Sequence, residues 1–158
     1  MSRSRLLAAL RLPLVALSTA LALLALPALA LGGDEGEDDQ EGWVELKKGL
    51  RYLDLEVGDG EEARPGMMVQ MHYTGWLEDG TRFESSLDSG QPLAFQLGRG
   101  RVIQGWEKGI VGMREGGRRK LDIPSPLAYG RRGRPQLIPR NANLVFEVEL
   151  IAVSRGAR

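Results

Sequence analysis

Aromatic side chains are the residues of this 158-residue chain whose types and spacing are best suited to form a binding pocket. Trp106 begins a short amphipathic segment, and five more aromatics stand near the ends of apolar stretches: Tyr73, Phe83, Phe95, Tyr129 and Phe146. Side chains of this kind indicate a dry apolar cup rather than a polar catalytic centre. On spacing alone, packing in the core of a small domain is the commoner explanation for them.

Groups for other kinds of chemistry are scarce. The chain has no cysteine, which excludes disulfides and a thiol nucleophile. Its one histidine, His72, cannot form a histidine metal cluster, and no aspartate stands in the context of a catalytic triad. Gly112 and Gly117 have a Walker-like separation, but Arg118 and Arg119 follow where Lys and Ser or Thr should stand. We therefore expect neither a cofactor nor a metal.

The charge balance gives no sign of a nucleic-acid partner. Basic and acidic residues are equal in number, 21 each, whereas nucleic-acid-binding domains carry a clear positive excess. One local exception is a loop rich in Gly and Pro that contains Arg131, Arg132, Arg134 and Arg140. A solvated loop explains these arginines, and a patch for an anionic partner is the alternative.

The first thirty residues read as a secretory signal peptide. Three arginines precede an apolar run from Leu12 to Leu26, and Ala28 and Ala30 form an Ala-x-Ala cleavage pattern. We expect cleavage near Ala30 and export to a periplasm or to the outside of the cell. An uncleaved signal anchor in the membrane is the alternative, because the apolar stretch approaches the twenty residues that a bilayer crossing needs.

An acidic stretch separates this signal from the rest of the chain. Residues 31–43 are dominated by Gly, Asp, Glu and Gln, which cannot bury enough apolar surface to repay ordering, so we expect a flexible tether. Calcium binding is the other function considered, but the spacing does not fit an EF-hand loop. A single domain is then expected at 44–154, with a short tail at 155–158, and we expect a monomer.

Alternating apolar and polar residues predict the strands that would position the aromatics. This two-residue period, typical of half-buried strands, is found at 53–57, 69–74, 119–123 and 144–150, and a further short strand is expected at 93–97, after Pro92. Asp79-Gly80 predicts a hairpin turn after the second of these strands.

One helix is expected among the strands. Apolar residues recur at helical spacing between Ile103 and Ile110, so we place a short helix at about 103–112. Gly105 and Gly109 each weaken it by about 1 kcal/mol, so tertiary packing must hold it. The predicted class is α+β, with an antiparallel sheet of five or six strands folded over a single helix.

Several motifs in a fixed order identify a family. They are His72-Tyr73-Thr74-Gly75, Leu77-Glu78-Asp79-Gly80, Phe83-Glu84-Ser85-Ser86, Val102-Ile103-Gln104-Gly105-Trp106-Glu107, Ala128-Tyr129-Gly130, Ile138-Pro139 and the strand from Leu144 to Leu150. From about Gly49 to Val153 the chain resembles the FKBP-type peptidyl-prolyl cis/trans isomerases, which also bind immunosuppressant macrolides. The resemblance implies a half-barrel sheet wrapped on one helix, and an enzyme that accelerates rotation of X-Pro bonds.

The resemblance also implies residue roles. Trp106 would form the pocket floor, and Tyr129 and the backbone amide of Ile103 would donate to a ligand carbonyl. The other catalytic positions would be Tyr73, Phe83, Glu84 and Phe146. Further substrate-binding positions would be Val102, Leu93, Phe95, Leu137 and Ile138, of which the last two match the flap above the cleft.

Four positions depart from the common family pattern: Glu84 stands for Asp, Leu93 for Phe, Ser89 for Arg and Arg134 for His. Leu93 widens one wall, which weakens the case for tight macrolide binding. We expect Glu84→Asp to keep or raise turnover. The expected partners are proline-containing unfolded or exported polypeptides, whose folding the protein would assist. A non-catalytic module or holdase that grips proline segments is the alternative.

Overall fold

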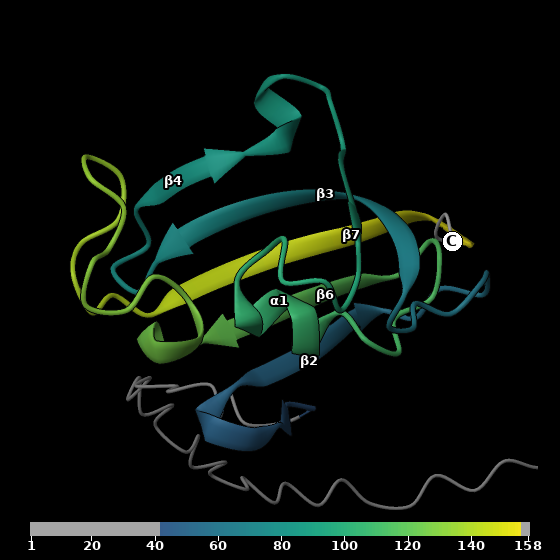
Figure 1. Cartoon of the computed structure of the whole chain (residues 1–158), viewed down its shortest axis with the longest axis horizontal. Helices are drawn as coiled ribbons and strands as arrows, with labels where there is room; N and C mark the ends of the chain where they lie inside the picture. The colour runs from purple at the N-terminus through teal and green to yellow at the C-terminus, as the bar shows by residue number, and fades with distance from the viewer. Residues whose placement is uncertain (1–41, 156–158) are drawn as a thin grey trace, which may run out of the picture. The chain divides into compact units, whose positions relative to one another are not determined.

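The computed structural model describes residues 42–155, which build one curved antiparallel sheet around one short helix (Figure 1). The predicted signal peptide, the expected tether up to residue 41 and the last three residues lie outside the described part. The strands are β1 (Val44–Glu45), β2 (Arg51–Glu56), β3 (Met67–Leu77), β4 (Arg82–Ser85), β5 (Leu93–Gln96), β6 (Arg118–Ile123) and β7 (Leu144–Arg155). The helix is α1 (Gln104–Gly109), and three 3-10 turns are η1 (Lys47–Gly49), η2 (Ser86–Asp88) and η3 (Ser125–Leu127).

The strand order is β1-β2-β6-β7-β3-β4, and β5 pairs with β3 as well. Every pairing among the described strands is antiparallel. The two end strands β1 and β4 do not pair with each other, so the sheet stays open. The class expected from the sequence is confirmed, and the described sheet has seven strands, one more than the upper number expected.

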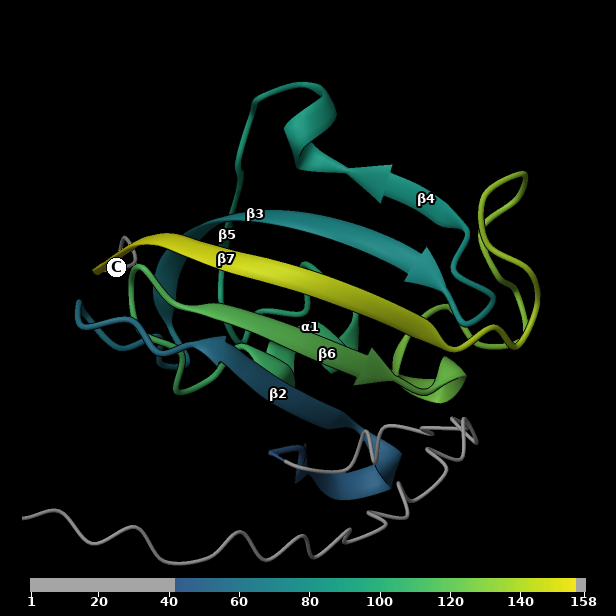
Figure 2. The same ribbon diagram turned by 180° about the vertical axis from the view of Figure 1, so that it is seen from behind.

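The two longest strands, β3 and β7, form the centre of the sheet. Their pairing runs from Met67 opposite Arg155 to Leu77 opposite Leu144, with one irregularity after Gln70. The sheet lies in front of α1 when the molecule is seen from behind, so the helix covers only the other face (Figure 2). The side chains of that inner face therefore determine what surrounds the helix.

The helix lies very close to β6, and this explains its two glycines. A Cβ at Gly105 would stand 2.4 Å from a methyl carbon of Ile123, and one at Gly109 would stand 2.7 Å from Leu121. Any larger residue would force α1 away from the sheet. The six-residue helix is shorter than the ten residues predicted, because it changes direction after Ile110.

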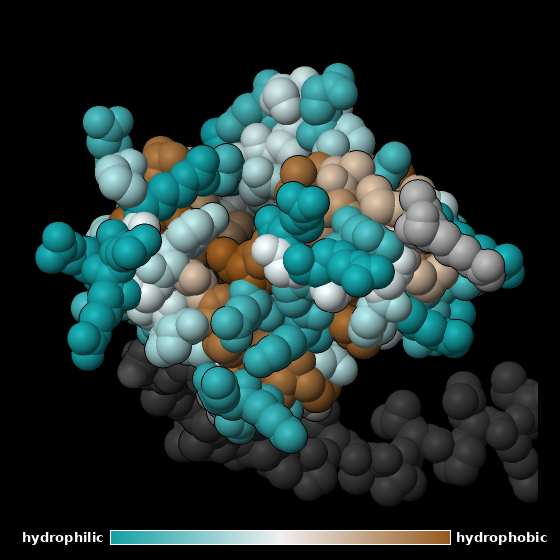
Figure 3. All heavy atoms as spheres, in the orientation of Figure 1, coloured by the Kyte–Doolittle hydropathy of each residue, from teal (hydrophilic) through white to brown (hydrophobic). Residues whose placement is uncertain are grey.

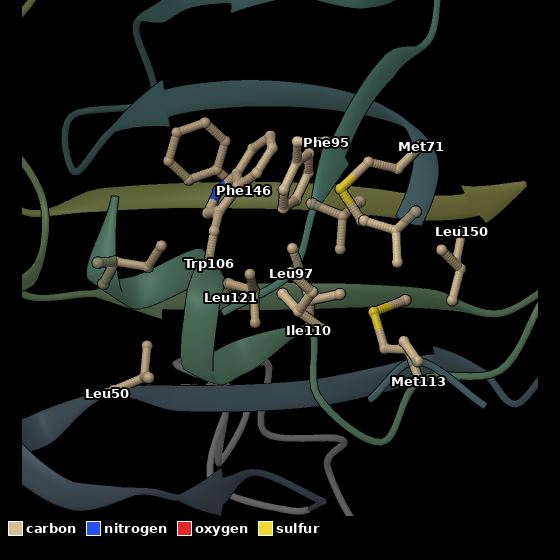
Figure 4. Packing of buried hydrophobic residues seen from close by; sticks show 14 of the residues in the cluster. Leu50, Met71, Phe95, Leu97, Trp106, Ile110, Met113, Leu121, Phe146 and Leu150 are labelled. Carbon is tan, nitrogen blue, oxygen red and sulfur yellow. The ribbon is translucent and has the colours of Figure 1, made fainter. Parts of the chain in front are cut away.

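A single apolar core fills the space between helix and sheet. The fully buried side chains include Leu50, Met71, Leu97, Ile110, Leu121, Ile123, Leu144 and Leu150. They come from β3, β6 and β7 and from the segments next to β2, β5 and α1 (Figure 4). The helix is thus held by burial, as its weak intrinsic propensity requires.

The five predicted strands appear as β2, β3, β5, β6 and β7, within about five residues of their predicted ends, and β1 and β4 are additional. In β2 the burial differs from the expected alternation: the strand ends at Glu56, and Val57 is 77% exposed. Leu55 is exposed too, while Tyr52 and Asp54 meet Arg119. The alternation therefore predicted the strand correctly, but the side chains of this strand that contact Arg119 are Tyr52 and Asp54. Among residues 42–155, no helix is long and apolar enough to cross a membrane.

Candidate functional site

A cavity of ≈ 140 Å³ opens between α1, β4 and the central strands. Its walls are formed by Tyr73, Glu84, Leu93, Arg101, Val102, Ile103, Trp106, Tyr129 and Phe146. Space-filling shows apolar surface near the middle of this side of the molecule, with hydrophilic side chains around it (Figure 3). Two hollows elsewhere are larger, at ≈ 260 Å³ each, but neither has more than one aromatic ring in its wall.

Trp106 separates this cavity from the core. It is only 3% exposed, and its ring meets Phe146 edge to face, with the centroids 5.2 Å apart (Figure 4). Tyr73 makes a second edge-to-face contact at 5.0 Å, and Phe95 lies on the core side at 6.1 Å. No described residue accepts a hydrogen bond from the buried indole N–H. The indole is therefore fixed by aromatic contacts while one side remains open to the cavity.

A glycine in β3 makes room for the rings. A Cβ at Gly75 would stand 2.6 Å from ring atoms of both Phe83 and Phe146, so only glycine allows them to pack over this strand. Phe83 then meets Phe146 edge to face at 5.6 Å. Phe83 thereby supports a cavity wall from behind, although it does not line the cavity itself.

A buried arginine holds the helix that carries Trp106. Arg119 of β6 has a side chain only 5% exposed, and its guanidinium donates to both carboxylate oxygens of Asp54, at 2.6 and 3.0 Å. It also donates to the carbonyl of Gly109 at 2.7 Å and lies over the Tyr52 ring at 3.9 Å. Since Gly109 is the last residue of α1, this cation satisfies a carbonyl at the negative end of the helix.

The opposite side of the cavity is held by a second ion pair. Arg134 donates to the Glu84 carboxylate at 2.8 Å, and both side chains are partly exposed. This contact raises the pKa of Arg134. The pKa of Tyr73 is raised as well, first by burial and then by the negative charge of Glu84. Tyr73 therefore stays neutral and protonated at ordinary pH.

The cavity also has free backbone hydrogen-bonding capacity. Ile103 precedes α1, and its carbonyl accepts from Trp106 and Glu107. No backbone carbonyl of the described residues accepts from the amide of Ile103. An apolar cavity with an available amide and a tyrosine at its edge can hold a carbonyl compound, with the donors setting its orientation.

Comparison with known proteins agrees with this geometry. Residues 59–151 match the model of the family described as FKBP-type peptidyl-prolyl cis-trans isomerase. The chain belongs to this family. The expected family and enzyme class, a peptidyl-prolyl isomerase, are thus confirmed.

Individual relatives of this FKBP-type isomerase are close. An FK506-binding protein of Neisseria meningitidis serogroup B is 55% identical over 105 residues, which cover 66% of this chain and 96% of that protein. The human peptidyl-prolyl cis-trans isomerase FKBP2 is 57% identical over 94 residues, or 60% of this chain and 66% of that protein. The crystal structure of FkpA from Escherichia coli superimposes with a TM-score of 0.69 at 40% identity, covering 75% of this chain and 55% of that one.

The structure of this FKBP-type isomerase brings eight of the twelve predicted site residues around one cavity. They are Tyr73, Glu84, Leu93, Val102, Ile103, Trp106, Tyr129 and Phe146. Phe83 and Phe95 lie one layer behind, against Phe146 and Trp106. Their direct contact with a substrate stays a prediction that nothing here tests.

The two predicted flap residues lie elsewhere. Leu137 and Ile138 border a different hollow, together with Leu77, Gln136 and Pro139. Ile138 is 4% exposed and exchanges two backbone hydrogen bonds with Arg134, at 2.8 and 2.9 Å, which close a tight turn. Ile138 therefore anchors the base of the loop, whereas Leu137 is 41% exposed.

Arg101 is the residue in the cavity wall that the sequence reading did not select. It directly precedes Val102 and Ile103, and this adjacency was the available signal. His72 lies in β3 with its Nδ1 2.9 Å from Ser86 Oγ, which fits the structural role expected for it.

Proposed function

We propose that this isomerase acts on X-Pro bonds of exported polypeptides in the cavity beside Trp106, and so assists their folding. The observation that carries the proposal is the aromatic-walled cavity itself. Its wall includes Trp106, Tyr73, Phe146 and Tyr129. Its volume is ≈ 140 Å³.

The chemistry asked of this cavity is modest. Rotation about a peptide bond loses amide resonance and meets a barrier of about 18 to 20 kcal/mol. The twisted amide is less polar than the planar one, so a dry environment favours it relative to water. A ten-thousandfold acceleration requires the barrier to fall by about 5.5 kcal/mol, and no nucleophile is needed for this.

Each part of the cavity has a role in this mechanism. The indole of Trp106 forms a floor for the proline ring, and Tyr73 and Phe146 exclude water from its sides. The Tyr129 hydroxyl and the Ile103 amide donate to the substrate carbonyl. Since Phe83 packs against Phe146, it keeps the wall in place. Leu137 would contact substrate from the loop that carries it.

Macrolides would compete for the same cavity. The bacterial relative is named an FK506-binding protein, and the two chains are 55% identical. In this chain Leu93 is 37% exposed at the cavity wall and presents less surface than an aromatic ring would. We therefore expect FK506 to inhibit the enzyme, with a weaker affinity than a wall with Phe at position 93 would give.

Nuclear magnetic resonance exchange on an X-Pro peptide tests the activity. Trp106→Phe should lower the acceleration by removing part of the floor, and Tyr129→Phe should lower it about tenfold by removing one hydrogen bond. Trp76→Phe is the matched control, since Trp76 borders a separate hollow with Leu77, Lys120 and Val145. Peptide binding without any acceleration by the unaltered chain would instead indicate a holding module.

Export is tested by the mass of the product made in a cell that secretes it. A chain that begins after Ala30 supports cleavage of the signal. A chain that retains Met1 to Ala30 supports a membrane anchor, with the isomerase tethered at the surface.

A further inference from the structure

The wall of the cavity carries two charged side chains. Of its nine wall residues, seven are uncharged, and the charged ones are Glu84 and Arg101. A peptide that places its proline beside Trp106 must bring the neighbouring residues past them. The net charge there therefore acts directly on the side chains that flank the proline.

The negative charge of Glu84 is already paired with a positive one. The Glu84 carboxylate accepts a hydrogen bond from Arg134 at 2.8 Å, within an ion pair whose side chains are 35% and 41% exposed. An approaching cation would have to compete with a guanidinium that is held in place by the turn between Arg134 and Ile138. Glu84 is thus a poor binding site for a basic side chain of the substrate.

The positive charge of Arg101 has no ion-pair partner among the described residues. Arg101 is exposed, and the ion pairs formed among residues 42–155 do not include it. The nearest acidic residue in sequence on α1, Glu107, is engaged by the backbone amide of Gly98 instead. Arg131 and Arg132, which follow Tyr129 closely in the chain, are exposed and add to the same sign of charge.

We propose that Arg101 is a specificity-determining residue that favours polypeptides with an acidic side chain next to the proline. This inference rests on the proposed function, because it assumes that substrate occupies the cavity beside Trp106. An aspartate or glutamate on either flank would pair with the free guanidinium, whereas lysine or arginine would be repelled. Arg101 touches the flanking residue rather than the twisting bond, so it acts on binding and not on the rotation step.

The expected effect is moderate, because Arg101 is exposed. Exposed ion pairs contribute little, so the preference for Glu over Gln at the flanking position should be about two- to fivefold in kcat/KM. The preference should reside in KM, and kcat should stay the same. It should also diminish at about 1 M salt, where the screening length is only about 3 Å.

The test uses peptides that differ at one residue beside proline. One set carries Glu, Gln or Lys before proline and a second set carries them after it, with exchange measured at low and high salt. The chain is compared with Arg101→Glu and with Arg99→Glu. Arg99 makes the same charge change possible two residues away, is exposed, and does not line the cavity.

The inference predicts the order Glu, Gln, Lys for the unaltered chain in at least one set, and the reverse order for Arg101→Glu. Arg99→Glu should keep the original order and the original acceleration of each peptide. Equal rates for the three peptides, or the same reversal by both variants, would overturn the assignment to Arg101. Loss of acceleration on every peptide with the unaltered chain would instead reject the proposed function.

Discussion

Two arginine–carboxylate pairs hold opposite sides of the cavity, and their surroundings differ sharply. Arg119 lies under α1 with a side chain 5% exposed, and it combines Asp54, a helix carbonyl and the Tyr52 ring. Arg134 lies at the rim with a side chain 41% exposed, and its hydrogen bond goes to Glu84 alone. Both join distant parts of the chain, β2 to β6 in one case and β4 to a loop in the other.

The difference shows that the buried pair stabilises the fold, whereas the pair at the rim contributes little to its stability. A buried guanidinium with several partners cannot be removed without leaving polar groups unpaired, so it fixes the position of α1 and Trp106. A partly exposed pair exchanges easily with water and contributes little to folding. The charge and length of the side chains at the rim can therefore change with little effect on folding, whereas the contacts of Arg119 that hold the floor cannot.

The largest effect is expected at the buried pair. Arg119→Ala leaves Asp54 and the Gly109 carbonyl without their donor and should lower the free energy of unfolding by about 2 to 3 kcal/mol. This is below the range for a fully buried pair, because the Asp54 side chain is 33% exposed. Urea denaturation measures the change. Arg119→Lys is the control, since lysine keeps the positive charge but lacks the planar guanidinium with its several donors. It should recover only part of the loss.

The rim pair should couple weakly. In a double-mutant cycle with Glu84→Gln and Arg134→Gln, the coupling in the free energy of unfolding should stay under about 1 kcal/mol. The same urea denaturation provides the values. A coupling as large as the loss from Arg119→Ala would show that the rim is as essential for folding as the floor, and the contrast between the two pairs would disappear.

Shortening the acid at the rim sharpens the contrast further. Glu84→Asp withdraws the carboxylate by about 1.5 Å and should weaken its bond to Arg134. We expect kcat to be kept or raised, since the twisting bond lies over Trp106, with KM changed by no more than about threefold. Steady-state exchange rates at several peptide concentrations separate the two constants. A large fall in kcat would mean that the longer acid takes part in rotation itself.

The smallest effect is a pH dependence at high pH. The pKa of Tyr73 is raised by burial and by Glu84, so the folded state favours the neutral phenol. Its contribution to stability is complete below a pH of about 10, the usual pKa of an exposed tyrosine, and is lost as pH rises through the folded value. Tyr73→Phe should remove this part of the slope of unfolding free energy against pH. An unchanged slope would show that other groups cause it.

Local patterns predicted more of the fold than of the rim. The alternation at β3, β6 and β7 appears in the structure because each strand buries one face on α1. The hairpin at Asp79 and Gly80 appears because its turn depends on those residues alone, with Gly80 in a left-handed conformation. The exception is β2, where a buried arginine from another strand draws Tyr52 and Asp54 to it. No local pattern contains information about such a partner.

By itself, the sequence determined the family, five of the seven described strands, the single helix and the aromatic residues of the cavity wall, because these follow from local periodicity and short motifs. Only the tertiary structure decided that Arg134 pairs with Glu84, that Arg101 has no ion-pair partner among the described residues, and that Ile138 closes a turn with Arg134. These contacts join residues up to fifty positions apart. Their energies depend on distance and burial, which only the folded chain defines.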